Sequence, residues 1–160
     1  MVKLSFTSNN LLLEWRDRTF QFLISATRFE AQEGRAAGLA FPELPVRALI
    51  DTGASLTIIN PEIAATCKLK QTGFQKISAV GGLAGEYPEY GAAIAFPGSE
   101  IPSLGAARVV ACPIIRQPVY SCLIGRDILQ KWVLTYNGKT GAIEIRNLNS
   151  TPRAPEYPAL

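Results

Sequence analysis

The stretch ALIDTGASLTII, residues 48–59, places a single carboxylate, that of Asp51, between two apolar segments. A buried charge is costly unless it is paired or hydrogen-bonded, so an aspartate in this setting needs a structural or chemical reason. Gly53 permits a close approach of backbone, and Thr52 supplies a hydroxyl that can bond to another segment. We therefore expect a strand that ends at Asp51, followed by a tight turn that presents the carboxylate.

The chain contains three aspartates, and the other two have ordinary explanations. Asp17 lies among charged residues, and Asp127 stands at an expected helix start, where its charge suits the helix dipole. A lone carboxylate hydrolyses amides poorly, because a base needs an acid partner, whereas two close carboxylates can share one proton. No second Asp-Thr-Gly or Asp-Ser-Gly occurs, so we expect a second copy to supply the partner across a two-fold axis.

The composition excludes several other chemistries. The chain has 160 residues and is 48% hydrophobic, which suits one compact domain with a real core. Histidine is absent, which removes Ser-His-Asp and Cys-His catalysis and zinc sites that need imidazole. Cys67, Cys112 and Cys122 lie far apart without a C-x-x-C motif, which argues against a metal cluster. The apolar surroundings of Cys112 and Cys122 lead us to expect buried thiols there, with a bridge between them left open. We expect neither a metal nor another cofactor.

Charge and hydropathy argue against nucleic acid and membrane partners. The net charge is +3, and no run of lysine or arginine occurs. No apolar stretch approaches the ~20 residues of a spanning helix. The apolar residues 11–13 run straight into Glu14, unlike a signal peptide. These features lead us to expect a cytoplasmic protein.

The periodicity of the chain has mainly strand character. We predict an all-β fold with one or two short helices, in a domain over residues 19–146 that follows an N-terminal extension, 1–18, and precedes a proline-rich tail, 147–160. The expected strands are 19–30, 44–51, 56–60, 106–112 and 120–125, with a hairpin over 133–145. Residues 33–38 are expected to form a turn, and helices are expected at 61–67 and 126–132. Two further strands within 75–96 flank a glycine-rich tip at 81–85.

Two segments together carry a family resemblance. ALIDTGAS at 48–55, followed by CLIGRDIL at 122–129, resembles the signature of retropepsin-like (retroviral-type) aspartic proteases, over roughly residues 20–146. The resemblance implies a closed β-barrel lobe that acts as a homodimer, because one motif in a short chain is unlike the two-lobed pepsins. The long segment after Gly125 is more similar to cellular and bacterial single-domain members, so the dimer contacts are expected to differ from the viral four-stranded terminal sheet.

The resemblance also assigns roles. It implies that Asp51 is catalytic and that the Thr52 hydroxyl bonds to the opposite subunit. Ser55 departs from the pattern of viral members, which often carry an acidic residue at this position that pairs with the arginine of the Gly-Arg-Asp motif. Arg126 then needs another partner, a backbone carbonyl or a glutamate. The remaining assignments are loop support from Thr52, Gly53, Ala54 and Ser55, a substrate-binding flap of Val80, Gly81, Gly82, Leu83, Ala84 and Gly85, and a structural motif of Ile124, Gly125, Arg126 and Asp127.

The function that follows is aspartic endopeptidase activity on extended polypeptides, with a water activated by two Asp51 carboxylates of a homodimer. Two alternatives stay open. The first is a catalytically silent dimer of the same fold that binds peptides or mediates protein interaction, because a fold does not certify an activity. The second is a domesticated retroelement protease that processes itself.

Overall fold

The structure is a computed structural model that describes residues 5–7, 10–13, 19–78, 84–114, 120–139 and 141–148. Its strands and helices follow one another along the chain as β1 (Ser5–Thr7), β2 (Asn10–Leu13), β3 (Thr19–Ser25), α1 (Arg28–Ala36), β4 (Leu44–Ile50), β5 (Ile58–Ile59), α2 (Pro61–Thr66), β6 (Lys70–Ser78), β7 (Ala84–Ala95), β8 (Leu104–Ala111), β9 (Cys122–Ile124), α3 (Arg126–Leu129), β10 (Trp132–Tyr136) and β11 (Ile143–Asn147).

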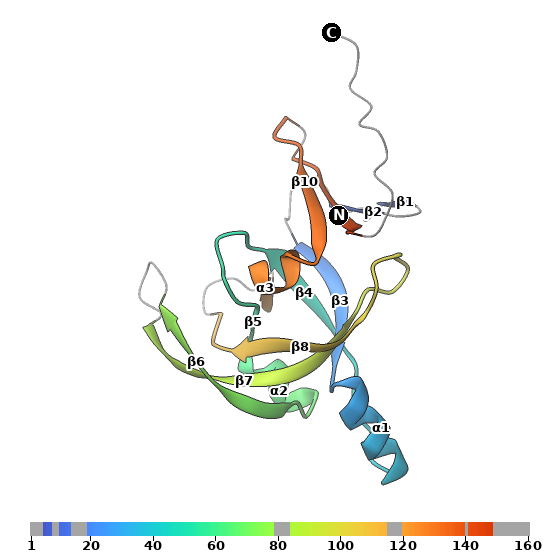
Figure 1. Cartoon of the computed structure of the whole chain (residues 1–160), viewed down its shortest axis with the longest axis vertical. Helices are drawn as coiled ribbons and strands as arrows, with labels where there is room; N and C mark the ends of the chain where they lie inside the picture. Colours follow the sequence, from blue (N-terminus) through green and yellow to red (C-terminus); the bar gives the residue numbers. More distant parts are fainter. Residues whose placement is uncertain are drawn as a thin grey trace.

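The main sheet closes on itself. Its strand order is β3-β4-β9-β5-β8-β7-β6, and an additional pairing between β3 and β7 closes the strands from β3 to β7 into a barrel (Figure 1). The β6–β7 hairpin extends from this barrel, because β6 pairs only with β7 in that order. The predicted mainly β fold with a closed barrel is confirmed.

Aromatic and branched side chains fill the barrel. Alternate residues of β3, Phe20, Phe22 and Ile24, are almost fully buried, as expected for a strand with one face on a core. Phe96 lies edge-on against Trp132, with ring centroids 5.2 Å apart. All three cysteines are free and buried, which confirms the expectation of core thiols and removes the Cys112–Cys122 bridge.

The sequence prediction missed helix α1. Residues 19–30 were expected to form one strand and 33–38 a turn, but β3 ends at Ser25 and α1 follows. Thr27 is the cause, because its hydroxyl accepts from the Glu30 N–H while the Glu30 carboxylate accepts from the Thr27 N–H at 3.1 Å. This capping box starts a helix inside a segment whose β-branched and aromatic residues indicate a strand. The helices predicted at 61–67 and from 126 are confirmed as α2 and α3, although α3 ends earlier than expected.

A second sheet joins the two ends of the chain. Its order is β1-β2-β11-β10, with Leu13 of β2 paired to Ile143 and Leu11 paired to Ile145 of β11. In Figure 1 this sheet lies above the barrel, on the side opposite α1. The boundaries at residues 18 and 147 stay predictions. No helix in the described part of the chain is long and apolar enough to cross a membrane.

The barrel brings two turns to the same edge. Strands β4 and β9 are parallel neighbours, with Leu49 opposite Leu123 and Ile50 opposite Ile124. Because parallel strands end at the same edge of a sheet, the residues after Ile50 and after Ile124 must lie side by side. The topology therefore places the Asp-Thr-Gly turn against the Gly-Arg-Asp turn.

Candidate active site

The backbone of its own turn orients the Asp51 carboxylate. Asp51 follows β4, and its N–H donates to the carbonyl of Ile124 at 3.0 Å. Its Oδ1 accepts hydrogen bonds from the N–H groups of Gly53, at 2.9 Å, and Ala54, at 3.1 Å. Its Oδ2 has no hydrogen-bond partner among the residues that the structure describes. The half-buried carboxylate is thus fixed through one oxygen, and the other remains available.

The turn itself lies at the surface. Thr52, Gly53 and Ser55 are exposed, and a Cβ added at Gly53 would lie only 3.1 Å from Asp51 Oδ1. A larger residue at position 53 would therefore crowd the carboxylate. The bond expected from Thr52 to an opposite subunit stays a prediction, since a single chain is present.

The Gly-Arg-Asp turn donates hydrogen bonds to the backbone carbonyls of the Asp51 turn. Arg126 Nη1 donates to the carbonyls of Thr52, at 3.0 Å, and Gly53, at 3.3 Å. The backbone N–H of Arg126 donates to the Ala54 carbonyl at 2.9 Å, and that of Asp127 to the Ser55 carbonyl at 3.3 Å. Of the two partners considered for Arg126, the structure has the backbone carbonyl.

Gly125 is required by a close approach of two backbone segments. A Cβ at this position would lie 2.5 Å from both the carbonyl carbon and the oxygen of Leu56. Backbone atoms cannot move aside as a flexible side chain does, so any other residue would push the two turns apart. Gly125 therefore sets the spacing between β9 and the segment that follows the Asp51 turn.

Sequence reasoning missed Thr57, which is fully buried beneath both turns. Its Oγ1 donates to Asp127 Oδ1 at 2.7 Å and accepts from the Gly125 N–H at 3.1 Å, and its own N–H donates to Asp127 Oδ2 at 3.0 Å. Asp127 Oδ1 also accepts from the N–H of Ile128 at 2.9 Å. The available signal was a lone hydroxyl in the apolar run LTII, which can be buried only with a polar partner.

An apolar surface lies beside Asp51 on the outer face of the barrel. Leu49 pairs with Leu123, which in turn pairs with Ile58, and all three are half-buried while their strand neighbours Ala48 and Ile124 are buried in the core. The alternation of side chains along β4 places Leu49 on the outer face and Ala48 on the inner one. The sequence prediction did not separate these two faces, because residues 48–50 are uniformly apolar.

The predicted flap is described only at its base. Val80, Gly81, Gly82 and Leu83 lie outside the described residues, whereas Ala84 and Gly85 begin β7 and pair with Ser78 and Ile77 of β6. The two strands expected on either side of the tip are confirmed. The assignment of these six residues to a substrate-binding flap stays a prediction.

Cys122 lies under the site but is unsuited to nucleophilic chemistry. Its side chain is fully buried on β9, and burial, followed by the nearby charge of Asp127, raises the pKa of its thiol. The thiolate is the reactive form, so a buried thiol with a raised pKa is inert at neutral pH. Among the described residues, no group of three or more cysteine, aspartate or glutamate side chains is arranged to hold a metal ion.

Comparisons with known proteins agree with this geometry. A profile of the family described as "gag-polyprotein putative aspartyl protease" matches residues 40–131, which contain both turns. The chain belongs to this family. A search of curated proteins gave no significant match.

Among solved structures, this aspartyl protease family member is similar to a retropepsin-like aspartic protease from Rickettsia conorii, over 92% of this chain and 97% of that one, with a TM-score of 0.54 and 14% identity. The EIAV protease complexed with the inhibitor HBY-793 matches over 72% of this chain and 86% of its own, with a TM-score of 0.42 and 19% identity. The retroviral protease-like domain of Ddi1 from Leishmania major matches over 68% and 89%, with a TM-score of 0.39 and 17% identity. The Rickettsia match shows the retropepsin-like fold that the sequence predicted.

Proposed function

We propose that this protein is an aspartic endopeptidase that cuts extended polypeptides as a homodimer. The observation that carries the proposal is the Asp51 carboxylate, which is held by two N–H groups through Oδ1 while Oδ2 has no partner in the described part of the chain. A carboxylate kept in place with one oxygen unused is suited to bind and activate a water.

The second carboxylate would come from another copy of the chain. Both oxygens of Asp127, the aspartate of the neighbouring turn, are already engaged by Thr57 and Ile128, so Asp127 is unavailable as a partner. The exposed backbone at Thr52 and Gly53 leaves room for the equivalent turn of a second chain. Two-fold symmetry would then set one Asp51 against the other, so that they share a proton.

Hydrolysis would follow from this shared proton. The ionised Asp51 takes a proton from the bound water as the water oxygen attacks the peptide carbonyl carbon, and the protonated Asp51 gives its proton to the carbonyl oxygen. The resulting diol collapses when its C–N bond breaks: the carboxyl group that took up the water proton gives it to the leaving nitrogen, and a diol hydroxyl returns its proton to the other carboxylate. Each carboxyl group returns to its starting state, and one water is consumed for each bond that is cut.

The surface beside Asp51 would bind the substrate. The half-buried side chains of Leu49, Leu123 and Ile58 offer an apolar wall to residues near the scissile bond. The β6–β7 hairpin supplies a strand edge that can pair with an extended peptide and exclude water. These features support endopeptidase activity rather than hydrolysis of a small ester or amide.

Mixing two kinds of chain tests both the residue and the dimer. A peptide library is digested with wild type, with Asp51→Asn, and with equal amounts of the two after free exchange. A shared site predicts that mixing lowers the activity per wild-type chain to about half, because random pairing gives half of those chains an inactive partner. Glu62→Gln, an exposed carboxylate on α2, is the matched control and should leave activity unchanged on mixing.

The outcomes separate the hypotheses. Cleavage that is inhibited by pepstatin and falls on mixing supports the proposal. Cleavage that does not change on mixing would show that each chain works alone. Peptide binding by wild type without cleavage, measured at a concentration where sedimentation shows a dimer, would favour the catalytically silent alternative.

A further inference from the structure

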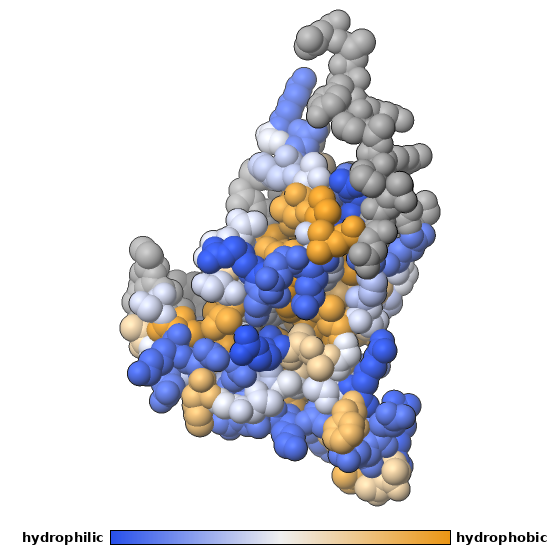
Figure 2. Space-filling view, in the orientation of Figure 1, coloured by the Kyte–Doolittle hydropathy of each residue, from blue (hydrophilic) through white to orange (hydrophobic). Residues whose placement is uncertain are grey.

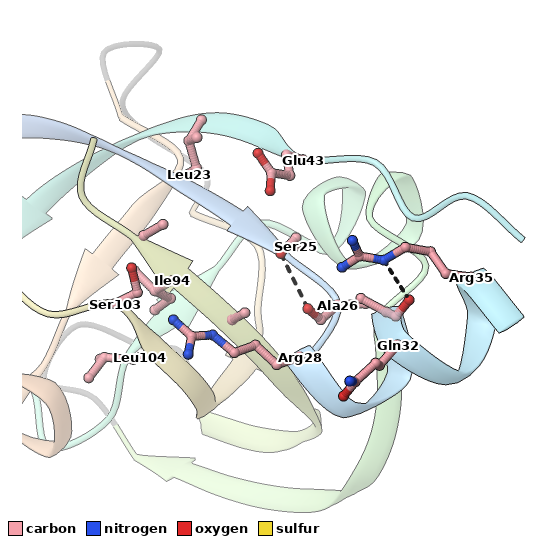
Figure 3. Close-up of a pocket in the computed structure, with 13 residues that line it drawn as sticks. Leu23, Ser25, Ala26, Arg28, Gln32, Arg35, Glu43, Ile94, Ser103 and Leu104 are labelled. Atoms are coloured by element: carbon pink, nitrogen blue, oxygen red, sulfur yellow. Dashed lines mark hydrogen bonds between the residues drawn. The ribbon is translucent and has the colours of Figure 1, made fainter. Parts of the chain in front are cut away.

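A groove far from Asp51 lies between helix α1 and the outer face of the barrel. It has a volume of about 590 Å³, and Figure 3 shows the side chains that line it. It lies at the end of the β3–β4 ladder where Ile24 pairs with Leu44, whereas Asp51 follows the other end, where Thr19 pairs with Leu49. Five residue steps along the strand separate the two ends, which is roughly 17 Å at the usual rise per residue. The groove is therefore separate from the candidate active site.

Two arginines from the same face of α1 line this groove. Arg28 and Arg35 lie two turns apart, so both project toward the barrel, as Figure 3 shows. Figure 2 shows hydrophilic and hydrophobic side chains side by side around α1 on the visible face. Within the described residues, neither arginine forms an ion pair. Their guanidinium groups are therefore available to an external anion.

Contacts within the protein orient both arginines. The stem of Arg28 passes over Gly105, where an added Cβ would lie 3.1 Å from Arg28 Cδ. Arg35 Nε donates to the carbonyl of Ala31 at 3.2 Å, which leaves its terminal nitrogens free. Side chains that are already oriented lose less entropy when they bind a ligand, so this arrangement favours binding.

The rest of the groove suits a polypeptide. Its floor consists of half-buried apolar side chains of β3 and β7, Leu23, Ala93 and Ala95, which can cover an extended chain. Glu43 lies on the rim across from Arg35 and forms no ion pair with either arginine (Figure 3). One carboxylate against two guanidinium groups leaves an excess of positive charge. The Glu43 carboxylate itself disfavours a polyanion such as nucleic acid, because it would repel the closely spaced phosphates.

We propose that this groove binds an acidic, extended stretch of the protein substrate at a distance from the bond that is cut. The identity of the ligand as a substrate rests on the proposed protease function. Carboxylate side chains of the stretch would bind Arg28 and Arg35, because guanidinium groups match carboxylates in charge and geometry. The apolar floor would cover its backbone, so the groove would select substrates by a segment other than the one that is cleaved.

Direct binding tests the groove without requiring catalysis. The probe is a fluorescein-labelled peptide of glutamates among alanines and serines, and its match carries glutamine at each glutamate position. Anisotropy is measured with the full chain carrying Asp51→Asn, so that the probe stays intact. We expect the acidic peptide to bind more tightly than its match, and to bind less tightly as salt rises.

Groove variants then localise the binding. The double change Arg28→Gln with Arg35→Gln should weaken the acidic peptide about tenfold, since each exposed charge pair contributes modestly. Glu43→Gln should tighten it, because a repulsive charge is lost. Lys139→Gln, which removes one exposed positive charge in the β10–β11 loop, should change the affinity little. Equal affinity of the acidic and neutral peptides, or an unchanged affinity of the double variant, would overturn the proposal.

Kinetics separate this proposal from the protease function. For a protein substrate with an acidic segment, the double variant should raise KM with kcat unchanged, while a short neutral peptide is cut as by wild type. Displacement of the acidic peptide is also compared between inorganic phosphate and sodium chloride at equal ionic strength. Equal displacement by the two salts would support carboxylate selectivity. Strong displacement by phosphate at low concentration would overturn it in favour of a phosphate site. Binding in a chain that cuts no peptide would leave the groove intact and refute the protease function alone.

Discussion

Asp51 and Asp127 follow neighbouring parallel strands, yet the protein holds them in opposite ways. Asp127 has both carboxylate oxygens engaged, by the hydroxyl and N–H of the buried Thr57 and by the N–H of Ile128. Asp51 is bonded through Oδ1 alone, to N–H groups of its own exposed turn. One aspartate therefore ties the two turns together, while the other is presented by them.

Neighbouring residues keep the Asp51 carboxylate in place although one of its oxygens is unused. The exposed turn has few bonds of its own, so its geometry depends on Arg126 and Asp127 of the neighbouring turn. Fully satisfied polar groups are stabilising, whereas a partly satisfied group is available for function. The Gly-Arg-Asp turn thus contributes stability and the Asp51 turn contributes the reactive group. Substitutions in the first should lower stability, and substitutions in the second should lower activity.

The largest expected effect is on catalysis at Asp51. Asp51→Asn should lower peptide cleavage by about a thousandfold or more, because an amide cannot act as acid or base. Its thermal midpoint should hardly change, since the amide oxygen can still accept the two N–H bonds. Asp127→Asn is the matched change and should instead lower the midpoint, because Thr57 loses a carboxylate acceptor. Cleavage at the wild-type rate by the Asp51 variant would show that this carboxylate does not take part in the reaction.

The next effect concerns the spacing of the turns. Gly125→Ala should lower the free energy of unfolding by about 3 kcal/mol, because its Cβ would overlap the backbone of Leu56. Gly73→Ala is the control, since no atom lies within 4 Å of the added Cβ there. Urea denaturation of both variants gives the values. A Gly125 variant as stable as its control would show that the two turns can move apart at little cost.

Removal of the Thr57 hydroxyl should have a smaller effect. Thr57→Val keeps the shape but leaves the Gly125 N–H without its partner and Asp127 Oδ1 with the Ile128 N–H alone, which should cost about 2 kcal/mol. The same change at the exposed Thr135 of β10 should stay within about 0.5 kcal/mol of wild type. If both changes cost the same, the hydroxyl does not hold the turns together.

The sequence predicted most of this arrangement and missed part of it for identifiable reasons. The Asp-Thr-Gly and Gly-Arg-Asp segments, each after an apolar strand, predicted the two turns, and the family resemblance that they carry implied the closed barrel. Thr57 was missed because its role depends on Asp127, which lies 70 positions away in the chain. Local patterns do not report such contacts, since a buried hydroxyl and a surface one have the same one-letter code.

Helix α1 and the groove beside it were missed for another reason. Thr27 and Glu30 form a capping box, but the preceding run of phenylalanine and isoleucine has strand periodicity, and the strand prediction was extended too far. The groove depends on α1 lying near β7, which begins 48 positions after α1 ends. Tertiary contacts of this kind decide which charged residues share a surface.

A modest effect is expected at Arg126, which links the two turns from the surface. Arg126→Gln should cost less than about 1 kcal/mol of stability, because the side chain is exposed and water can replace it. Cleavage should fall by a few fold, since the carbonyls of Thr52 and Gly53 lose the group that fixes them. Lys131→Gln, an exposed neighbour, is the control for charge. A loss of stability without any loss of cleavage would contradict the positioning role.

At neutral pH the smallest effect is that of Cys122, which lies near Asp127, because it is expressed only above pH 9. Burial and the Asp127 charge raise the pKa of this thiol above its ordinary value of 9.0, so on unfolding it becomes the stronger acid. The unfolded chain then binds fewer protons above pH 9, and the free energy of unfolding must fall there, by no more than about 1.4 kcal/mol per pH unit for this thiol. Cys122→Ala should reduce that slope while running parallel to wild type between pH 6 and 8, as measured by urea denaturation. An unchanged slope above pH 9 would mean that the thiol titrates alike in the folded and unfolded chains, and that the interior below the two turns is less shielded than the burial of Cys122 implies.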